Sequence, residues 1–389
     1  MPYFDWNATA PLLPEAREAW LEASGRYWAN PSTPYREGVR ARLALDEARE
    51  RVAVCLGVDP EQVVFTSGAT EGNNGLLREA MRRLSPAAEV WISAVEHPCV
   101  RESAFSWWGP ERVRVMPVKA SGELDGEWLE ACLEKSRPGL LCLMAVNNET
   151  GVIQPVERAV DLCRERGVPV FCDAVQWVGK QLAPADLASR CDALVASGHK
   201  FGGPKGIGFV VLGSEWRGVR LQTGGAQELA SRAGTENLAG ILAMVAALEA
   251  RCQLSLPGDQ KAARDHFESE LTALWPDEVI IYGKEAARSW NTCMVSLPEY
   301  RADRWINRLD KLGFQVSSGS ACSSGKEGIS GVLQAMQADI DQARRAIRIS
   351  SGWETRPADW DGLLEALKRV REQLDSEESG SGPGQVIEI

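Results

Sequence analysis

Lys200 and Asp173 have the residue types and the settings that imine chemistry requires. Lys200 stands in a glycine-rich turn between two apolar runs, where a lysine can lose its hydration, so that its pKa falls and its amine can form an imine with an aldehyde cofactor. Asp173 also follows an apolar run, and Gln176 comes three residues later. A carboxylate in apolar surroundings needs a partner, and a protonated pyridine nitrogen would serve. Each motif alone also fits a plainer interpretation, a solvated lysine or an aspartate that caps the next helix.

Small and hydroxyl residues open a helix-like stretch after the apolar run at 63–66. The segment 67–71 reads Ser-Gly-Ala-Thr-Glu, and the backbone N–H groups and the dipole of such a helix start favour a phosphate. An ordinary capped helix is the alternative. His97 and His199, two of the three histidines, also follow apolar runs. We expect His97 to lie flat on a cofactor ring or to relay protons, with a buried structural histidine as the alternative.

Cys322 differs from the other nine cysteines in its setting. The segment around it, 317–326, is rich in serine and glycine, which is typical of a wet loop rather than of a core. An accessible thiolate there could act as a nucleophile, and an inert loop cysteine is the alternative. The ten cysteines form neither a zinc-like pair of CxxC motifs nor a regular disulfide spacing, so we expect no metal site.

The elements that must position these residues form a repeating pattern. Between about residues 60 and 213, apolar runs alternate with helix-like segments, which predicts an α/β fold with a mainly parallel, doubly wound sheet. Ligands bind beyond the carboxyl ends of the strands in such sheets, which is where the candidate residues fall. The expected strands are 63–66, 89–94, 139–147, 168–174, 192–197 and 208–212.

A smaller α+β domain is predicted after an alanine- and leucine-rich helix at 238–252. We expect a large cofactor-binding domain at 13–254 and a small domain made of 1–12 and 255–375. Residues 376–389 have linker composition, which predicts a disordered tail. In the small domain we expect strands at 279–282, 292–296, 314–317 and 346–350, and helices around 260–274, 302–312 and 357–374.

Composition excludes some classes of function. The net charge of −11 argues against sequence-independent nucleic-acid binding, which depends on lysine and arginine. The apolar runs are far shorter than the roughly 20 residues of a membrane-spanning helix. The first residues lack the basic and apolar regions of a secretion signal, so the cytoplasm is the expected location.

Taken together, six motifs resemble the cysteine desulfurases of the NifS/IscS type, in the class V aminotransferase family. The resemblance covers roughly residues 3–372. It implies the fold-type I architecture of enzymes that use pyridoxal 5′-phosphate (PLP), a homodimer, and release of sulfur from L-cysteine with L-alanine as product. The motifs are GATE at 68–71, EH at 96–97, VNNETG at 146–151, DAVQ at 173–176, SGHK at 197–200 and SSGSAC at 317–322.

The resemblance also assigns chemical roles. Lys200 would carry PLP as an imine and would remove the α-proton of the substrate. Asp173 would pair with the pyridine nitrogen, Gln176 would bond the ring hydroxyl, and His97 would stack on the ring. Cys322 would attack the substrate sulfur and carry it as a persulfide to an acceptor protein. The 26 residues from Cys322 to Arg348 match the long-loop subgroup of the family.

Substrate and phosphate contacts follow from the same resemblance. Asn148 would lie near the ring oxygen and the substrate carboxylate, Arg348 would bind that carboxylate with its planar fork, and Asn30 would help to frame the pocket. The phosphate would be bound by Ala69, Thr70, Ser197 and His199, and by Thr235 from the partner subunit.

Two departures from the family pattern stand out. Tyr35 replaces a usual histidine, and 327–330 reads Glu-Gly-Ile-Ser where the family has Glu-Pro-Ser, a change that bears on the acceptor protein. The sulfur could go to iron–sulfur cluster assembly, tRNA thiolation or cofactor synthesis. The alternatives are a selenocysteine lyase, another class V aminotransferase or lyase, and a non-catalytic sulfur-carrier scaffold. The complete set of Lys, Asp, His, Gln and Arg argues against the scaffold.

Overall fold

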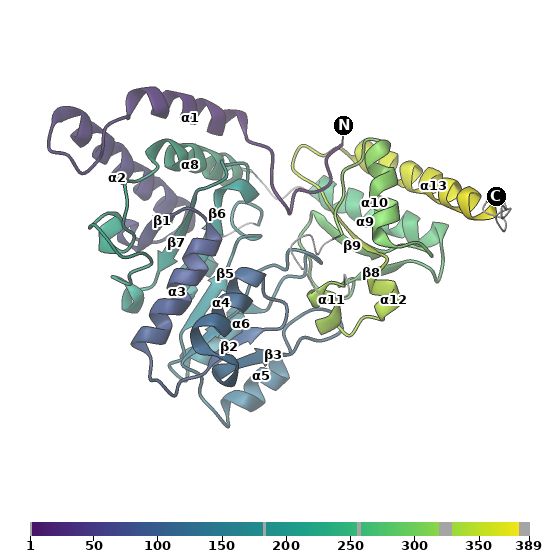
Figure 1. Cartoon of the computed structure of the whole chain (residues 1–389), viewed down its shortest axis with the longest axis horizontal. Coiled ribbons are helices and arrows are strands. Elements are labelled where there is room, and N and C mark those ends of the chain that lie inside the picture. Colours follow the sequence, from purple (N-terminus) through teal and green to yellow (C-terminus); the bar gives the residue numbers. More distant parts are fainter. Residues whose placement is uncertain (1, 182–183, 255–257, 319–328, 381–389) are drawn as a thin grey trace, which may run out of the picture.

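Two β-sheets organise the described part of the chain, one of seven strands and one of three. The computed structural model describes residues 2–181, 184–254, 258–318 and 329–380. In Figure 1 the seven-stranded sheet lies on the left with its helices, and the three-stranded sheet lies on the right.

The larger sheet is mainly parallel, as the sequence predicts. Its strands lie in the order β1-β7-β6-β5-β4-β2-β3, and only β7 runs antiparallel to its neighbours. Most strands are buried along their whole length, because helices cover both faces of the sheet. The predicted α/β fold is therefore confirmed. The strands are β1 (Val63–Thr66), β2 (Val90–Ser93), β3 (Val113–Met116), β4 (Leu140–Cys142), β5 (Val170–Asp173), β6 (Ala193–Ser197) and β7 (Gly208–Leu212).

Strand β3 is absent from the sequence-based prediction. It lies at the edge of the sheet, beside β2 alone, and three of its four residues are only half-buried. Its sequence, Val-Arg-Val-Met, lacks the continuous apolar run of the central strands. An edge strand needs no such run because one side of it remains open.

Helices cover both faces of this sheet, and neighbouring residues of one strand pack against different helices. Val63 and Phe65 contact the core beside α2 and α8, whereas Val64 contacts the core beside α3 and α4, because side chains alternate along a strand. The first face carries α1 (Pro14–Arg26), α2 (Arg36–Leu56), α5 (Gly126–Leu133), α6 (Val156–Arg164), α7 (Pro184–Arg190) and α8 (Leu238–Cys252), and the second face carries α3 (Ala69–Arg83) and α4 (Pro98–Trp108).

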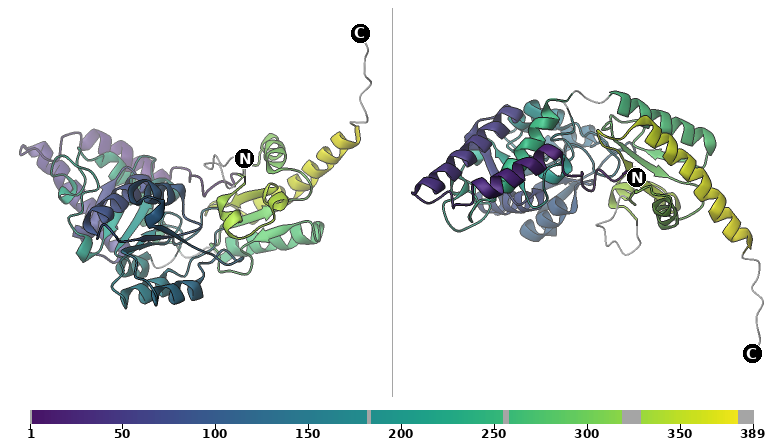
Figure 2. Two further views of the ribbon diagram at one scale, coloured as in Figure 1. Left: turned by 60° about the horizontal axis from the view of Figure 1, so that its bottom comes forward. Right: turned by 90° about the horizontal axis from the view of Figure 1, so that it is seen from above.

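The smaller sheet is antiparallel, in the order β10-β9-β8. Two long helices, α9 and α13, lie side by side against it and bury its apolar face (Figure 2). Its strands are β8 (Ile280–Tyr282), β9 (Thr292–Ser296) and β10 (Ala346–Ser350), and its helices are α9 (Gly258–Leu274), α10 (Ala302–Lys311), α11 (Gly331–Ala335), α12 (Ile340–Ala343) and α13 (Pro357–Gly380).

The strand predicted at 314–317 is wrong. This segment forms only isolated bridges, from Gln315 to Tyr3 and from Ser317 to Arg348. Successive residues therefore pair with two different partners, so no continuous ladder forms.

The disordered tail predicted from residue 376 is wrong for residues 376–380, because α13 continues to Gly380. Its last turns carry Glu377 and Glu378, which form ion pairs with Arg304 of α10 at 3.5 and 3.1 Å. The Ser- and Gly-rich composition indicates a linker, but these opposite charges hold the helix against its neighbour. Residues 381–389 lie outside the described part.

The segment 3–13 connects the two sheets. It begins beside the smaller sheet, where Tyr3 and Asp5 form bridges with Gln315 and Ser350, and then crosses to α1 (Figure 1). Farther along, the N–H of Ala10 donates to the carbonyl of His199 at 2.8 Å. The proposed domain boundaries at residues 12 and 254 stay a prediction. No helix in the described ranges is long and apolar enough to span a membrane.

Candidate active site

The predicted residues gather at the carboxyl ends of β5 and β6. Asp173 is the last residue of β5, and Ser197 is the last residue of β6. The two strands are parallel neighbours with Asp173 opposite Val195, so their ends lie together. A short 3₁₀ turn, Gly198–Lys200, follows β6 and carries Lys200 to the same edge.

Lys200 and Gln176 meet at one carbonyl oxygen of the connecting segment. The Nζ of Lys200 donates to the carbonyl of Asn7 at 2.7 Å and to that of Ala8 at 2.8 Å. The Nε2 of Gln176 donates to the same Asn7 oxygen at 2.9 Å. The structure thus brings the predicted lysine and the predicted amide together.

Asp173 is a buried carboxylate, with 6% of its surface exposed. Its Oδ2 accepts from Asn73 Nδ2 at 3.0 Å, and its Oδ1 accepts from the N–H of Val175 at 3.1 Å. Burial raises the pKa of Asp173, while the nearby His97 and Lys200 lower it. A carboxylate in this state gains much from a cation placed against it.

His97 lies beside Asp173 and is neutral near pH 7. It caps α4, and its Nδ1 accepts from the N–H of Cys99 at 3.2 Å. Burial lowers the pKa of His97, Asp173 raises it and Lys200 lowers it, with a net fall. The thiol of Cys99 lies 3.0 Å from the same Nδ1 and 3.9 Å from Asp173 Oδ2, and burial raises its pKa, so it stays protonated.

The start of α3 lies beside the end of β6. Gly68 precedes the helix with φ +151°, and no side chain caps the first turn. A Cβ on Gly68 would lie 3.6 Å from Ser197 Oγ, and a Cβ on Gly208 would lie 2.8 Å from the Cα of Gly68. Gly208 therefore allows the start of α3 to lie close to the end of β6, and the positive φ of Gly68 suits a glycine. The phosphate contacts of Ala69, Thr70 and Ser197 stay a prediction.

His199 contacts the connecting segment rather than a predicted residue. Its Nδ1 lies 3.2 Å from Thr9 Oγ1. Burial and the charges of Lys200, Lys205 and Lys180 lower the pKa of His199 to about 4, so the ring is neutral.

Arg348 lies in the middle of β10 with only 4% of its surface exposed. Its Nη2 pairs with Asp5 Oδ1 at 2.6 Å, and its Nη1 donates to the carbonyl of Asn148 at 3.1 Å. Its Nε is buried without a hydrogen-bond partner among the described residues. The predicted pair Arg348 and Asn148 is thus in contact, and Asp5 supplies a carboxylate to the arginine.

Sequence reasoning missed Asn7 and Lys180, which complete the site. Asn7 Nδ2 donates to Thr292 Oγ1 at 2.9 Å and to the Asn148 carbonyl at 3.2 Å, and its Oδ1 accepts from Lys180 Nζ at 2.9 Å. One signal for Lys180 was present, since it follows Gln176 by four residues in an otherwise apolar stretch. No local signal marks Asn7, because its contacts come from distant parts of the chain.

Three predicted residues are not joined to this group. Asn30 is exposed, and its Oδ1 accepts from the N–H of Ser32 at 2.9 Å within its own turn. Thr235 is exposed and lines a cavity of about 130 Å³ with Ser67. Cys322 lies outside the described residues. The roles of all three stay predictions.

A sequence model of the family described as aminotransferase class-V matches residues 2–362. The chain belongs to this family. Class-V relatives include a cysteine desulfurase from Cereibacter sphaeroides, 37% identical with 96% of each chain covered. Another is the cysteine desulfurase IscS of Dictyoglomus turgidum, 34% identical, with 96% of this chain and 95% of the relative covered.

Two solved structures agree with the fold. A NifS-like protein is 31% identical with a TM-score of 0.84, covering 96% of this chain and 99% of that chain. A protein described as SspA in complex with cysteine is 30% identical with a TM-score of 0.75, covering 90% and 99%. The predicted resemblance to the NifS/IscS type is therefore confirmed.

Proposed function

We propose that this chain is a cysteine desulfurase that releases sulfur from L-cysteine and leaves L-alanine. The observation that supports it most is the shared contact of Lys200 and Gln176 with Asn7, next to the buried Asp173. Relatives that carry the name cysteine desulfurase match 96% of the chain.

We propose PLP as the cofactor because three features fit its chemistry. The uncapped start of α3 beside Ser197 suits a phosphate, the buried Asp173 suits a protonated ring nitrogen, and the amine of Lys200 suits an aldehyde. When bound, PLP supplies an electron-poor ring that takes up the electrons released at the substrate α-carbon.

Each side chain of the site would then have a separate role in the reaction. Lys200 would move the proton of the substrate α-carbon, and Asp173 would keep the ring nitrogen protonated by its negative charge. His97, neutral and half-buried, would cover one face of the site. Arg348 would bind the substrate carboxylate with the donors of its guanidinium that Asp5 and Asn148 leave over.

Cys322 would take the sulfur. Its thiolate attacks the sulfur of the substrate, a new S–S bond forms, and the C–S bond of the substrate breaks. The electron pair of that bond stays on carbon, which is protonated to give alanine, and Cys322 holds the persulfide for an acceptor protein. The homodimer, the acceptor and the cytoplasmic location stay predictions.

The decisive experiment uses L-cysteine with a thiol reductant and measures sulfide and alanine. We expect equal amounts of both from the wild type. Cys322→Ala is expected to lose sulfide release but to keep the absorbance band of PLP on Lys200. Undiminished sulfide from this variant contradicts the persulfide route, and a band that survives in Lys200→Ala contradicts the assigned lysine.

A further inference from the structure

Lys180 is a buried lysine that the proposed reaction does not use. Only 3% of its surface is exposed, and its Nζ donates to Gln176 Oε1 at 2.5 Å and to Asn7 Oδ1 at 2.9 Å. Both acceptors are neutral, and no carboxylate of the described residues lies within ion-pair distance of the amine. Burial lowers the pKa of Lys180 well below its ordinary value. Burying an amine in this way is unfavourable for folding, so a structural filler would be apolar.

The contacts with Lys180 and with the Asn7 carbonyl together set which way the amide of Gln176 faces. An amide has an oxygen that only accepts and a nitrogen that only donates. Because the Lys180 amine donates to Oε1, the Nε2 group lies on the other side, where it donates to the Asn7 carbonyl at 2.9 Å. Lys200 donates to that same carbonyl at 2.7 Å. The N–H groups of Gln176 are thus placed next to Lys200.

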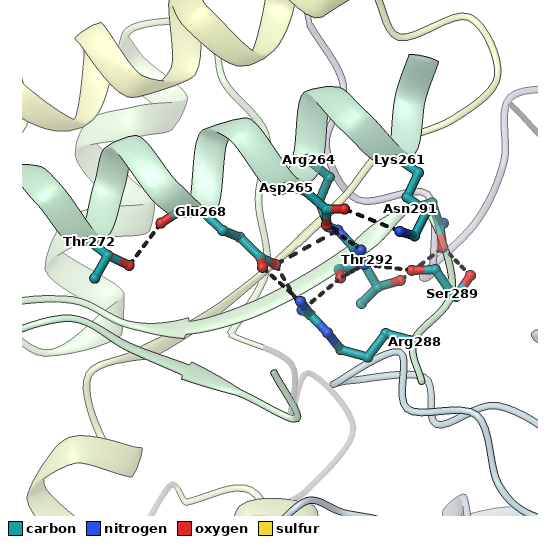
Figure 3. Close-up of polar contacts among 9 residues, drawn as sticks. All are labelled: Lys261, Arg264, Asp265, Glu268, Thr272, Arg288, Ser289, Asn291 and Thr292. Atoms are coloured by element: carbon teal, nitrogen blue, oxygen red, sulfur yellow. Dashed lines mark hydrogen bonds and ion pairs between the residues drawn. The ribbon is translucent and has the colours of Figure 1, made fainter. Parts of the chain in front are cut away.

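Asn7 and Lys180 are themselves held from the smaller sheet. Asn291 Nδ2 donates to Asn7 Oδ1 at 3.1 Å, and Trp290 Nε1 donates to the Lys180 carbonyl at 2.8 Å. Figure 3 shows the hydrogen bonds that hold residues 289–291, just before β9, in place. Ser289 Oγ donates to Asn291 Oδ1 at 2.7 Å, and Arg264 of α9 donates to the Ser289 carbonyl at 2.8 Å.

We propose that Lys180 is a positioning residue that fixes the amide of Gln176 with its N–H groups toward Lys200 and the ring hydroxyl of the cofactor. This inference rests on the proposed binding of PLP. A donor at the ring oxygen stabilises the anionic oxygen, which then holds the proton of the neighbouring imine less strongly. Without Lys180 only the Asn7 carbonyl holds the amide, which then turns more easily and donates less to the ring oxygen.

The test measures the pKa of the Lys200 imine by absorbance in the absence of substrate. Four PLP-loaded proteins are compared: wild type, Lys180→Met, Gln176→Ala and the double variant. We expect Lys180→Met to raise the imine pKa by about half a unit to one unit, or roughly threefold to tenfold in proton affinity, as for one lost hydrogen bond. The double variant should shift no further than Gln176→Ala, because both changes remove the same contact.

Lys180 could also act through its charge, and the double variant distinguishes this effect from positioning. Lys180 lies near Lys200, Arg348, Arg251 and Asp5, so loss of its charge could itself change the imine pKa. Shifts that add in the double variant therefore overturn the positioning role. Lys311→Met removes an exposed lysine at the end of α10 and serves as the control, with no shift expected.

Failure of the inference and failure of the proposed function are separable. A wild type without an imine band overturns PLP binding itself. A normal wild-type band with an unchanged pKa in Lys180→Met overturns the role of Lys180 alone. The fold of each apo protein is checked by thermal unfolding. If Lys180→Met does not fold, Asn7→Ala decides: it removes one of the two acceptors of Lys180, a smaller shift in the same direction supports the role, and no shift overturns it.

Discussion

Buried charges are arranged differently in two regions of this molecule. In the cluster of Figure 3, Arg288 and Glu268 are each 5% exposed and form two parallel bonds of 2.7 Å. Burial lowers the pKa of Arg288, but the bonds to Glu268 raise it more. Near the ends of β5 and β6, burial instead sets the direction of the net pKa shifts. It raises the pKa of Asp173 and lowers that of Lys180.

The difference separates a structural role from a chemical one. A buried ion that is fully paired within the chain has no capacity left for a ligand. A buried ion whose pKa is displaced by burial gains when a ligand supplies the missing charge or hydrogen bond. The cluster around Arg288 therefore has a structural role beside the smaller sheet, whereas the group around Asp173 is suited to binding.

Removing one charge from the paired cluster should have the largest effect. Glu268→Gln leaves Arg288 buried without its counter-charge, and we expect a loss of about 3–5 kcal/mol in the free energy of unfolding. Urea unfolding of the apo protein measures it. Glu270→Gln, an exposed glutamate of the same helix, should change stability by about 0.5 kcal/mol or less. A loss below about 1 kcal/mol in Glu268→Gln contradicts the comparison.

Neutralising the carboxylate of Asp173 should change stability little and activity strongly. Asp173→Asn removes a charge that burial disfavours, so its free energy of unfolding should stay within about 1 kcal/mol of the wild type. Alanine formation should fall about 10²–10³-fold, the usual cost of losing one preorganised electrostatic contact. Urea unfolding and alanine assays on the same preparations measure both. A large loss of stability without loss of turnover would assign Asp173 to the structural class.

Glu96 gives the smallest and most specific effect. Its Oε1 accepts from Ser93 Oγ at 2.6 Å and from the N–H of Met144 at 2.7 Å, and burial raises its pKa from 4.5 to about 8. Between these pH values the folded protein holds a proton that the unfolded chain lacks, so stability falls as the pH rises. Glu96→Gln has no such proton to lose and so lacks this pH-dependent change in stability. Its stability relative to the wild type should grow by about 1–3 kcal/mol from pH 5 to pH 8, measured by urea unfolding. An equal difference at both pH values contradicts the raised pKa.

The sequence predicts the bounds of buried strands and the site residues that follow them. β1, β7, β9 and β10 have the predicted bounds. All four are buried along their whole length, so their sequences are mostly apolar even where Arg348 interrupts β10. Residues at strand ends, such as Asp173 and Lys200, follow at once, since neighbouring parallel strands bring their ends together.

The other half of the site depends on contacts that no local pattern encodes. Asn7 contacts residues from several distant segments, among them Gln176, Thr292 and Ser350, and nothing in its own neighbourhood indicates this. The edge strand β3 and the broken pairing at 314–317 were missed for a related reason. Both depend on which neighbour is present in space, not on the apolar content of the segment.

The segment that joins the two sheets also sets an order of events during synthesis. Asn7 is made long before Ser350, yet its N–H donates to Ser350 Oγ at 3.0 Å, across 343 positions of the chain. This contact forms only after β10 has left the ribosome, and long-range pairing of this kind is slow. The contacts of Asn7 beside Lys200 therefore stay incomplete until β10 has been made, and we expect the proposed cofactor to be loaded only after that step.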